Sequence, residues 1–328
     1  MISDTDSGIG ELSIRSGSFT WTNIDRLDAE LLRSLKASYH FHDLDIEDCL
    51  SKTQTPKIDE YQDYLFIIFH FPRYLKEKRY SVPMQVSIFL GRDFLVTVHN
   101  GELKPLNNLF ALYRSTGQVV DAGRNEKTAC SLTATSPSSL LYTIIYTLVE
   151  NLLVMGSKIM SNIEEIEEIV FDEQISAVRE VTGLRHNIAN FRRSVFPLRR
   201  VIYELEKKIG RFTGEDMGNY FGDLTDYIEK VWAIAEECRE AIEIYKDTDV
   251  IISSDRTNKI LTVLTILFTF SIPFTLLGTL YGMNVVLPGG LERPWTFLGP
   301  YSTFIFILLA SFVPVLCMFT IFRKLKWL

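Results

Sequence analysis

The first residues that could do chemistry together are two histidines and several acids in HFHDLDIEDC, residues 40–49. Such a group could suggest a metal-dependent hydrolase of the HD type. A catalytic metal site, however, needs ligands that converge from several elements. The remaining histidines, His70, His99 and His186, have no recognisable partner motif. We therefore interpret the segment as the start of an ordinary amphipathic helix.

Two other motifs carry little chemistry. Gly8-Ile9-Gly10 lacks the preceding strand, the third glycine and the following helix of a dinucleotide site. The four cysteines are far apart, without the spacing of a zinc site or a disulfide framework, which indicates a reducing compartment; they are Cys49, Cys130, Cys238 and Cys317. Nothing else resembles a nucleophile or a phosphate loop, so we expect neither an enzyme nor a cofactor.

Composition and charge favour cations as partners. The 328 residues are 47% hydrophobic, which excludes a disordered chain, and contain 34 Lys and Arg against 41 Asp and Glu. Every acidic residue lies at or before Glu292, whereas Arg293 and a basic tail follow it. The acidic part favours cations over nucleic acid.

Two long uncharged segments predict membrane helices. No charged residue occurs from Ile260 to Leu291 or from Tyr301 to Phe322. Each segment is long enough to cross a hydrocarbon core of about 30 Å. Basic residues flank the outer ends of the pair, so both ends are expected in the cytoplasm; they are Arg256, Lys259, Arg323, Lys324 and Lys326. With no secretory signal at the N-terminus, we expect a multi-pass protein of the cell membrane with both termini cytoplasmic.

The remaining pattern predicts a cytosolic part with two kinds of structure. Residues 1–136 are expected to form an α/β domain, because 64–71, 82–90 and 93–100 are rich in β-branched and aromatic residues. Two helices are expected beside these strands, one in residues 24–39 and one that Asp43 caps at its N-terminus. Residues 137–218 have helical periodicity and are expected to form a bundle, in which Pro197 kinks a helix or ends a segment. Three glycines within 210–219 predict the clearest break in this helical region.

One long helix is expected to connect the cytosol with the membrane. No proline or glycine cluster interrupts the pattern from about Tyr220 until Pro273. We divide this part into a stalk (219–259), a first transmembrane helix (260–281), an external loop (282–300), a second transmembrane helix (301–322) and a basic cytosolic tail (323–328). A helix of that length must pack on others, and a two-helix hairpin is too small to enclose a pore. Any conduction therefore needs several chains.

Gly282-Met283-Asn284, after Tyr281 at the outer end of the first span, resembles the signature of the CorA family of divalent-cation channels. Other segments resemble CorA in the same order, so that the similarity covers nearly the whole chain; they are TPKIDEYQDYLFIIFHF, LRHNIANFRRSVFPLRR, RTNKILTVLT and the closing KLKWL. The resemblance implies a homopentameric funnel that transports Mg²⁺ or Co²⁺. In it the α/β domains form the funnel, the long helix lines the pore and the second span forms an outer ring.

Helical geometry is consistent with a pore-lining stripe. At about 100° per residue, eight positions fall within an arc of about 120°; they are Asn258, Leu261, Leu264, Phe268, Ile272, Thr275, Thr279 and Gly282. Without the resemblance, such a stripe is more typical of a lipid-facing or helix-facing surface. With it, the apolar middle could gate by dewetting, while Asn258, Thr275 and Thr279 supply oxygen rings.

The expected selectivity site is uncharged. Mg²⁺ dehydrates reluctantly, so a ring of Asn284 amides and Gly282 carbonyls could hold its water shell without stripping it. The resemblance also implies regulatory Mg²⁺ at Asp223, but the partner position is occupied by Leu75, and Glu77 is only the nearest acid. Gating through Asp223 is then expected to be weakened, or to use Asp226 or Glu229.

Two alternatives remain open at this level. One is a Zn²⁺ transporter of the ZntB type, which shares the architecture and a related tripeptide. The other is a membrane metal sensor that does not conduct. The external loop VVLPGGLERP carries only Glu292 beside Arg293, which suggests weaker ion capture than an acidic loop would give.

Overall fold

The computed structural model describes residues 13–16, 19–51, 54–75, 80–116, 134–171, 177–290, 295–297, 299 and 301–324. They fall into two compact units, Met1–Asp247 and Thr248–Leu328. Several residues discussed above lie outside the described residues; they are Gly8, Ile9, Gly10, Glu77, Cys130, Leu291, Glu292, Arg293 and Lys326.

The first unit contains a mixed six-stranded sheet in the order β1-β2-β6-β5-β4-β3. Strand β2 pairs with β6 in parallel, and the other neighbours are antiparallel. The strands are β1 (Ser13–Ser16), β2 (Phe19–Ile24), β3 (Lys57–Glu60), β4 (Tyr64–Leu75), β5 (Tyr80–Gly91) and β6 (Phe94–His99). The predicted strands at 64–71, 82–90 and 93–100 are therefore confirmed as the centre of this sheet.

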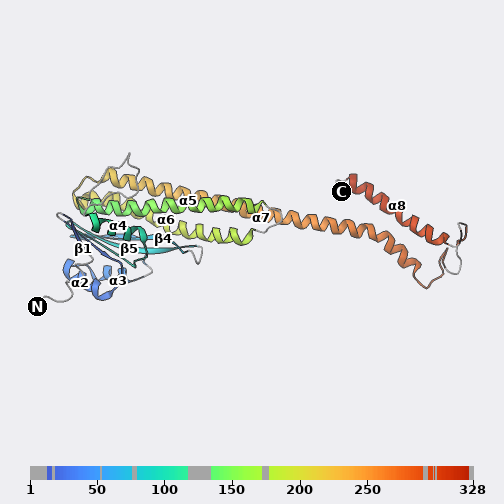
Figure 1. Cartoon of the computed structure of the whole chain (residues 1–328), viewed down its shortest axis with the longest axis horizontal. Coiled ribbons are helices and arrows are strands. Elements are labelled where there is room, and N and C mark those ends of the chain that lie inside the picture. Colours follow the sequence, from blue (N-terminus) through green and yellow to red (C-terminus); the bar gives the residue numbers. More distant parts are fainter. Residues whose placement is uncertain are drawn as a thin grey trace. The chain divides into compact units, whose positions relative to one another are not determined.

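Helices cover both faces of the sheet (Figure 1). Because side chains alternate along a strand, Leu65 and Ile67 of β4 enter the core shared with the long helices. Phe66 and Ile68 enter the core on the opposite face, beneath α2 (Ala29–Tyr39) and α3 (Asp43–Leu50). Burial on both faces explains why β4 reads as an unbroken apolar run.

Two details of these short helices differ from the prediction. The helix expected in residues 24–39 begins only at Ala29, because Asp28 caps it by accepting from the Glu30 amide at 2.9 Å, and Ile24 belongs to β2. The N-cap of α3 is His42, not Asp43: the imidazole Nδ1 accepts from the Leu44 amide at 3.3 Å.

The helices that follow in the described part of the first unit are α4 (Lys104–Thr116), α5 (Pro137–Val170), α6 (Val178–Thr213) and α7 (Gly218–Tyr281) as far as Asp247. Helix α6 continues through Pro197, so no segment ends there, whereas the alternative expectation of a kink stays a prediction. Val195 and Leu198 on either side are fully buried, and their packing maintains the helix across the missing hydrogen bond. The predicted break in 210–219 is confirmed, because Gly214 ends α6 with φ of 72°.

Helix α5 is long and apolar enough to cross a membrane, although the sequence analysis predicts no membrane span there. In its most apolar window 61% of the residues are buried within the protein, against 6% in the corresponding windows of α7 and of α8 (Ser302–Lys324). Its apolar side chains are thus covered by the core of the first unit, not left for lipid.

Helices α6 and α7 are joined by a ladder of ion pairs with a seven-residue repeat. The arginines of α6 have rising residue numbers while their glutamate partners on α7 have falling ones, so the two helices are antiparallel and in register. The pairs are Arg185–Glu243 at 2.8 Å, Arg192–Glu236 at 2.6 Å and Arg199–Glu229 at 2.7 Å. Trp232 lies between two rungs, with the Arg192 and Arg199 guanidinium carbons 5.4 and 5.0 Å from its ring centroid. Cation–π contacts and charge-assisted hydrogen bonds therefore reinforce one another along this seam.

Candidate ion pathway

The apolar part of α7 and all of α8 lie in the second unit. Aromatic contacts join the two helices: Phe270 and Phe322 have ring centroids 5.8 Å apart, and Phe274 and Phe312 have theirs 5.7 Å apart. Most of both surfaces remains uncovered by this chain, as the low buried share shows. Lipid or further protein must therefore cover them.

The predicted stripe is exposed along its length within one chain. Its apolar middle is Leu261, Leu264, Phe268 and Ile272, with 54%, 43%, 67% and 56% of each surface exposed. Asn258, Thr275 and Thr279 are also exposed. The structure thus brings the stripe together on a continuous helix and leaves it free for a partner, but neighbouring positions such as Leu267 (62%) are equally exposed.

The hydroxyls of the stripe are held by their own helix. Thr275 Oγ1 donates to the Ser271 carbonyl at 2.9 Å, and Thr279 Oγ1 donates to the Thr275 carbonyl at 2.6 Å. Because each proton is used in this way, the remaining lone pairs of both oxygens point outward as acceptors. Acceptor oxygens can meet a metal-bound water, which is a hydrogen-bond donor.

The Gly282-Met283-Asn284 segment terminates α7. The helix ends at Tyr281, yet the Gly282 amide still donates to the Gly278 carbonyl at 2.9 Å. A Cβ at position 282 would lie only 3.0 Å from that carbonyl oxygen, which favours glycine at this turn. Asn284 is exposed, and no other described residue hydrogen-bonds its amide.

Two contacts missed at the sequence level support this turn. Tyr281 Oη donates to the Pro288 carbonyl at 3.1 Å, which ties the end of α7 to the loop. Gly289, at φ of 76°, approaches the Trp295 ring so closely that an added Cβ would lie 2.8 Å from it. The Pro-Gly-Gly sequence indicates a turn, but nothing in it identifies the aromatic partner.

The acidic residues proposed for regulation are not gathered into one site. Asp223 is half-buried on α7, Asp226 is exposed, and Glu229 is engaged by Arg199 through two hydrogen bonds of 2.8 and 2.7 Å. Within the described residues no three His, Cys, Asp or Glu side chains are grouped to hold a metal ion. Leu75 lies at the end of β4 and supplies no ligand.

The histidine and acid segment at 40–49 has a structural role. Buried Asp45 accepts hydrogen bonds from Tyr64 Oη at 2.6 Å and Tyr61 Oη at 3.0 Å. Burial raises the pKa of Asp45 although these two donors oppose the effect, and burial with the bond to Asp45 raises the pKa of Tyr61 to about 12. The acid is thus committed to hydroxyl donors, not to a metal.

The sheet, the long helix and the apolar hairpin together define a membrane-transporter architecture. The family model for the CorA-like Mg²⁺ transporter protein matches residues 16–324. The chain therefore belongs to the CorA-like Mg²⁺ transporter family.

One curated relative is similar in sequence, and two solved structures share the fold. The cobalt/magnesium transport protein CorA of Thermotoga maritima is 25% identical over 311 residues, which cover 94% of this chain and 83% of that protein. The solved structure of the CorA magnesium transporter from Methanocaldococcus jannaschii is similar with a TM-score of 0.74 and 21% identity, over 97% of this chain and 94% of that one. The full-length CmaX structure has a TM-score of 0.71 and 18% identity, over 94% and 89%.

Proposed function

We propose that this protein is a homopentameric channel that moves hydrated Mg²⁺, and also Co²⁺ or Ni²⁺, across the cytoplasmic membrane. The observation that carries the proposal is the exposed stripe of α7, a helix whose apolar part is largely uncovered, followed directly after the helix by the exposed Asn284. Five copies around an axis would bury these stripes against one another. Family membership supports the same reading.

In this arrangement each part of the stripe has its own task. Asn284 amides and Gly282 carbonyls receive the hydrated ion outside, with Met283 completing the motif. Thr275 and Thr279 form an inner ring of acceptors, and Asn258 a ring toward the cytosol. The apolar residues between them form a dry section that closes the pore when it is narrow. Both termini would lie in the cytoplasm, as the basic flanks require.

Replacing Asn284 tests the pathway. Asn284→Ala is expected to reduce Mg²⁺ flux into proteoliposomes to the level of empty vesicles, because the first acceptors for the water shell are lost. Val285→Ala, which shortens the next exposed side chain of the same turn, is the matched control and should retain flux. Native mass spectrometry should show pentamers for both variants. Normal flux through the Asn284 variant would refute the assigned role.

The same assay separates the ions. Zn²⁺, Co²⁺ and Ni²⁺ are offered beside Mg²⁺, with and without a pH gradient. Transport of Zn²⁺ in preference to Mg²⁺ would replace the proposal with a ZntB-type function. The absence of any divalent flux would leave a membrane metal sensor.

We also propose that cytosolic Mg²⁺ closes the channel weakly through Asp223. Its support is the half-buried position of Asp223 on α7 and the missing acid at Leu75. Asp223→Ala is expected to shift the internal Mg²⁺ concentration that halves the current upward by only a few-fold, because one carboxylate per chain contributes. Asp226→Ala is the matched variant. If Asp223→Ala leaves inhibition unchanged, Asp223 is a solvated stalk residue.

A further inference from the structure

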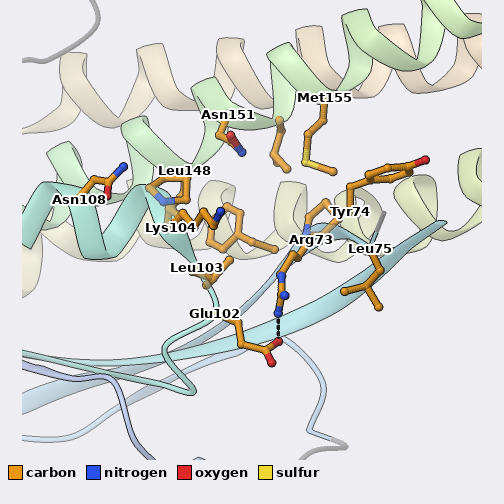
Figure 2. A pocket seen from close by; sticks show the side chains of 14 residues that line it. Arg73, Tyr74, Leu75, Glu102, Leu103, Lys104, Asn108, Leu148, Asn151 and Met155 are labelled. Carbon is orange, nitrogen blue, oxygen red and sulfur yellow. Dashed lines mark ion pairs between the residues drawn. The ribbon is translucent and has the colours of Figure 1, made fainter. Parts of the chain in front are cut away.

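A cavity of about 790 Å³ lies within the first unit (Figure 2). It is open to solvent on one side and is lined by the end of β4, the start of α4 and the middle of α5. This volume is in the range of sites for small organic molecules. Leu75, where the expected regulatory acid is missing, is among the residues that line the cavity, but the roles proposed above do not use the cavity as a binding site.

One wall of the cavity is apolar. Leu148, Leu152 and Met155 follow each other on one face of α5, and Leu103 lies opposite them before α4. Leu148, Leu152 and Leu103 are at most 4% exposed. Little carbon surface of these three leucines is left to cover, so the apolar body of a ligand would gain chiefly by covering Met155 and Tyr74, which are more exposed and also line the cavity.

The other lining groups are cationic or amide. Arg73 forms an ion pair with Glu102, which leaves Lys104 as the lining cation without an acidic partner among the described residues. Asn108 is one turn after Lys104 on α4, and Asn151 stands among the apolar residues of α5 (Figure 2). Two cations against one acid make the cavity positive, which disfavours Mg²⁺ and favours an anion.

We propose that this cavity binds a soluble organic anion with an apolar body, such as an aryl or alkyl phosphate or carboxylate. The anionic group accepts from the Lys104 ammonium and from the Asn151 and Asn108 amides, and the body lies along Leu148, Leu152 and Met155. Arg73 and Glu102 close the site from the β4 side. The proposal does not depend on ion conduction.

Phenyl phosphate is a suitable probe because it joins an anion to an apolar ring. Its affinity for the full chain, held in phosphatidylcholine nanodiscs, is measured by calorimetry beside inorganic phosphate and phenol. Phenyl phosphate is expected to bind at least about tenfold tighter than either fragment, since each fragment meets only one wall. No binding, or equal binding of inorganic phosphate, would overturn the proposal.

Variants locate the site. Lys104→Met is expected to weaken phenyl phosphate about tenfold or more, as the loss of a charge-assisted hydrogen bond does, and Asn151→Leu to weaken it several-fold. Lys158→Met, an exposed lysine of α5 that does not line the cavity, should leave affinity unchanged. Unchanged affinity in Lys104→Met would place the ligand elsewhere and refute the assignment.

Two other occupants are distinguished in the same experiment. If phenyl phosphate binds only to dissociated monomers, a second copy of the chain covers the cavity and the proposal fails. If phosphatidylglycerol in the nanodisc competes with the probe, the ligand is a lipid headgroup instead of a soluble anion.

Discussion

His99 is buried in a network of hydrogen bonds, and its partners determine which ring nitrogen carries the proton. Its Nδ1 accepts from the Gly101 amide at 3.0 Å, so Nε2 carries the proton toward Asn23 Oδ1 at 3.1 Å. Thr97 Oγ1 donates to the same Asn23 oxygen at 2.7 Å and accepts from Trp21 Nε1 at 3.1 Å. Burial lowers the pKa of His99 to about 4, against a weak opposing effect of Asp25.

This pKa predicts a loss of stability in mild acid. The unfolded chain takes up a proton near pH 6.5 but the folded chain only near pH 4, so stability is complete above pH 6.5 and falls between these values. The contribution is about 3 kcal/mol at its largest. Denaturation followed by tryptophan fluorescence should show the decline, and His99→Phe should reduce its slope. An equal slope in His99→Phe, with His186→Phe as control, would contradict the assignment.

The sequence could predict some residues of the candidate site but not the contacts of others. Gly282 and Asn284 were predicted because a signature at the end of a long uncharged segment is specific in type and place. The engagement of Glu229 by Arg199 was not, because the two residues lie on different helices and their registry depends on how α6 and α7 pack. The cavity could not be predicted either, because its walls come from β4, α4 and α5, which only tertiary packing brings together.

At the scale of elements, the ladder between α6 and α7 makes two helices act as one. Each rung is only partly exposed, with side chains of Arg192 and Glu236 at 31% and 27%. Burial alone would raise the pKa of Glu236, but hydrogen bonds from Arg192 and Arg239 outweigh it and hold that pKa below its usual value. The carboxylate is therefore charged at neutral pH and loses the interaction as the pH falls below about 4.5.

A double-mutant cycle measures this rung. Arg192→Gln and Glu236→Gln, alone and together, are expected to give a coupling of about 1 kcal/mol in the free energy of unfolding. Arg200–Glu204, an i,i+4 pair within α6 at 3.3 Å with 73% and 37% exposure, is the control, and should couple by about 0.3–0.5 kcal/mol. Equal couplings would mean that the interhelical rung is no stronger than a surface pair.

The elements themselves followed largely from periodicity and composition. Alternating and helical patterns predicted the central strands and the long helix. The predicted break in 210–219 is confirmed, because α6 ends at Gly214. The start of α2 could not be predicted because a cap contact decided it, and the sequence left open whether Pro197 kinks a helix or ends a segment because tertiary packing decided that. Strand order, with the parallel pair β2 and β6, depends on contacts distant in sequence.

At the scale of the whole molecule, three helices among the described residues satisfy the length and composition of a membrane span, but only two of these three lack protein cover. Hydropathy alone does not separate them. The distinction comes from the sheet and α6, which bury the apolar face of α5. Composition thus predicts membrane association, whereas tertiary packing decides which apolar helix enters the lipid.

Cysteine labelling tests this assignment. In a variant with Cys130 and Cys317 replaced by Ser, Val154→Cys on α5 (64% exposed) should react with a water-soluble maleimide in inside-out vesicles. Leu267→Cys on α7 is equally exposed in one chain, at 62%, and should be protected, because lipid or another subunit covers it. Protection of Val154→Cys from the aqueous reagent would place α5 in the membrane instead.

The seven-residue spacing of the ladder also restricts how the length of α6 and α7 can change. Removing one residue between Glu229 and Glu236 would rotate one glutamate relative to the other by about 100° around α7. If Arg192 then kept its ion pair with Glu236, Arg199 would lose its ion pair with Glu229. Removing seven residues from each helix together would instead preserve the match. Insertions and deletions in the ion-paired parts of α6 and α7 should therefore be tolerated only when both helices change by the same multiple of seven residues. The loop that joins the helices is free of that constraint.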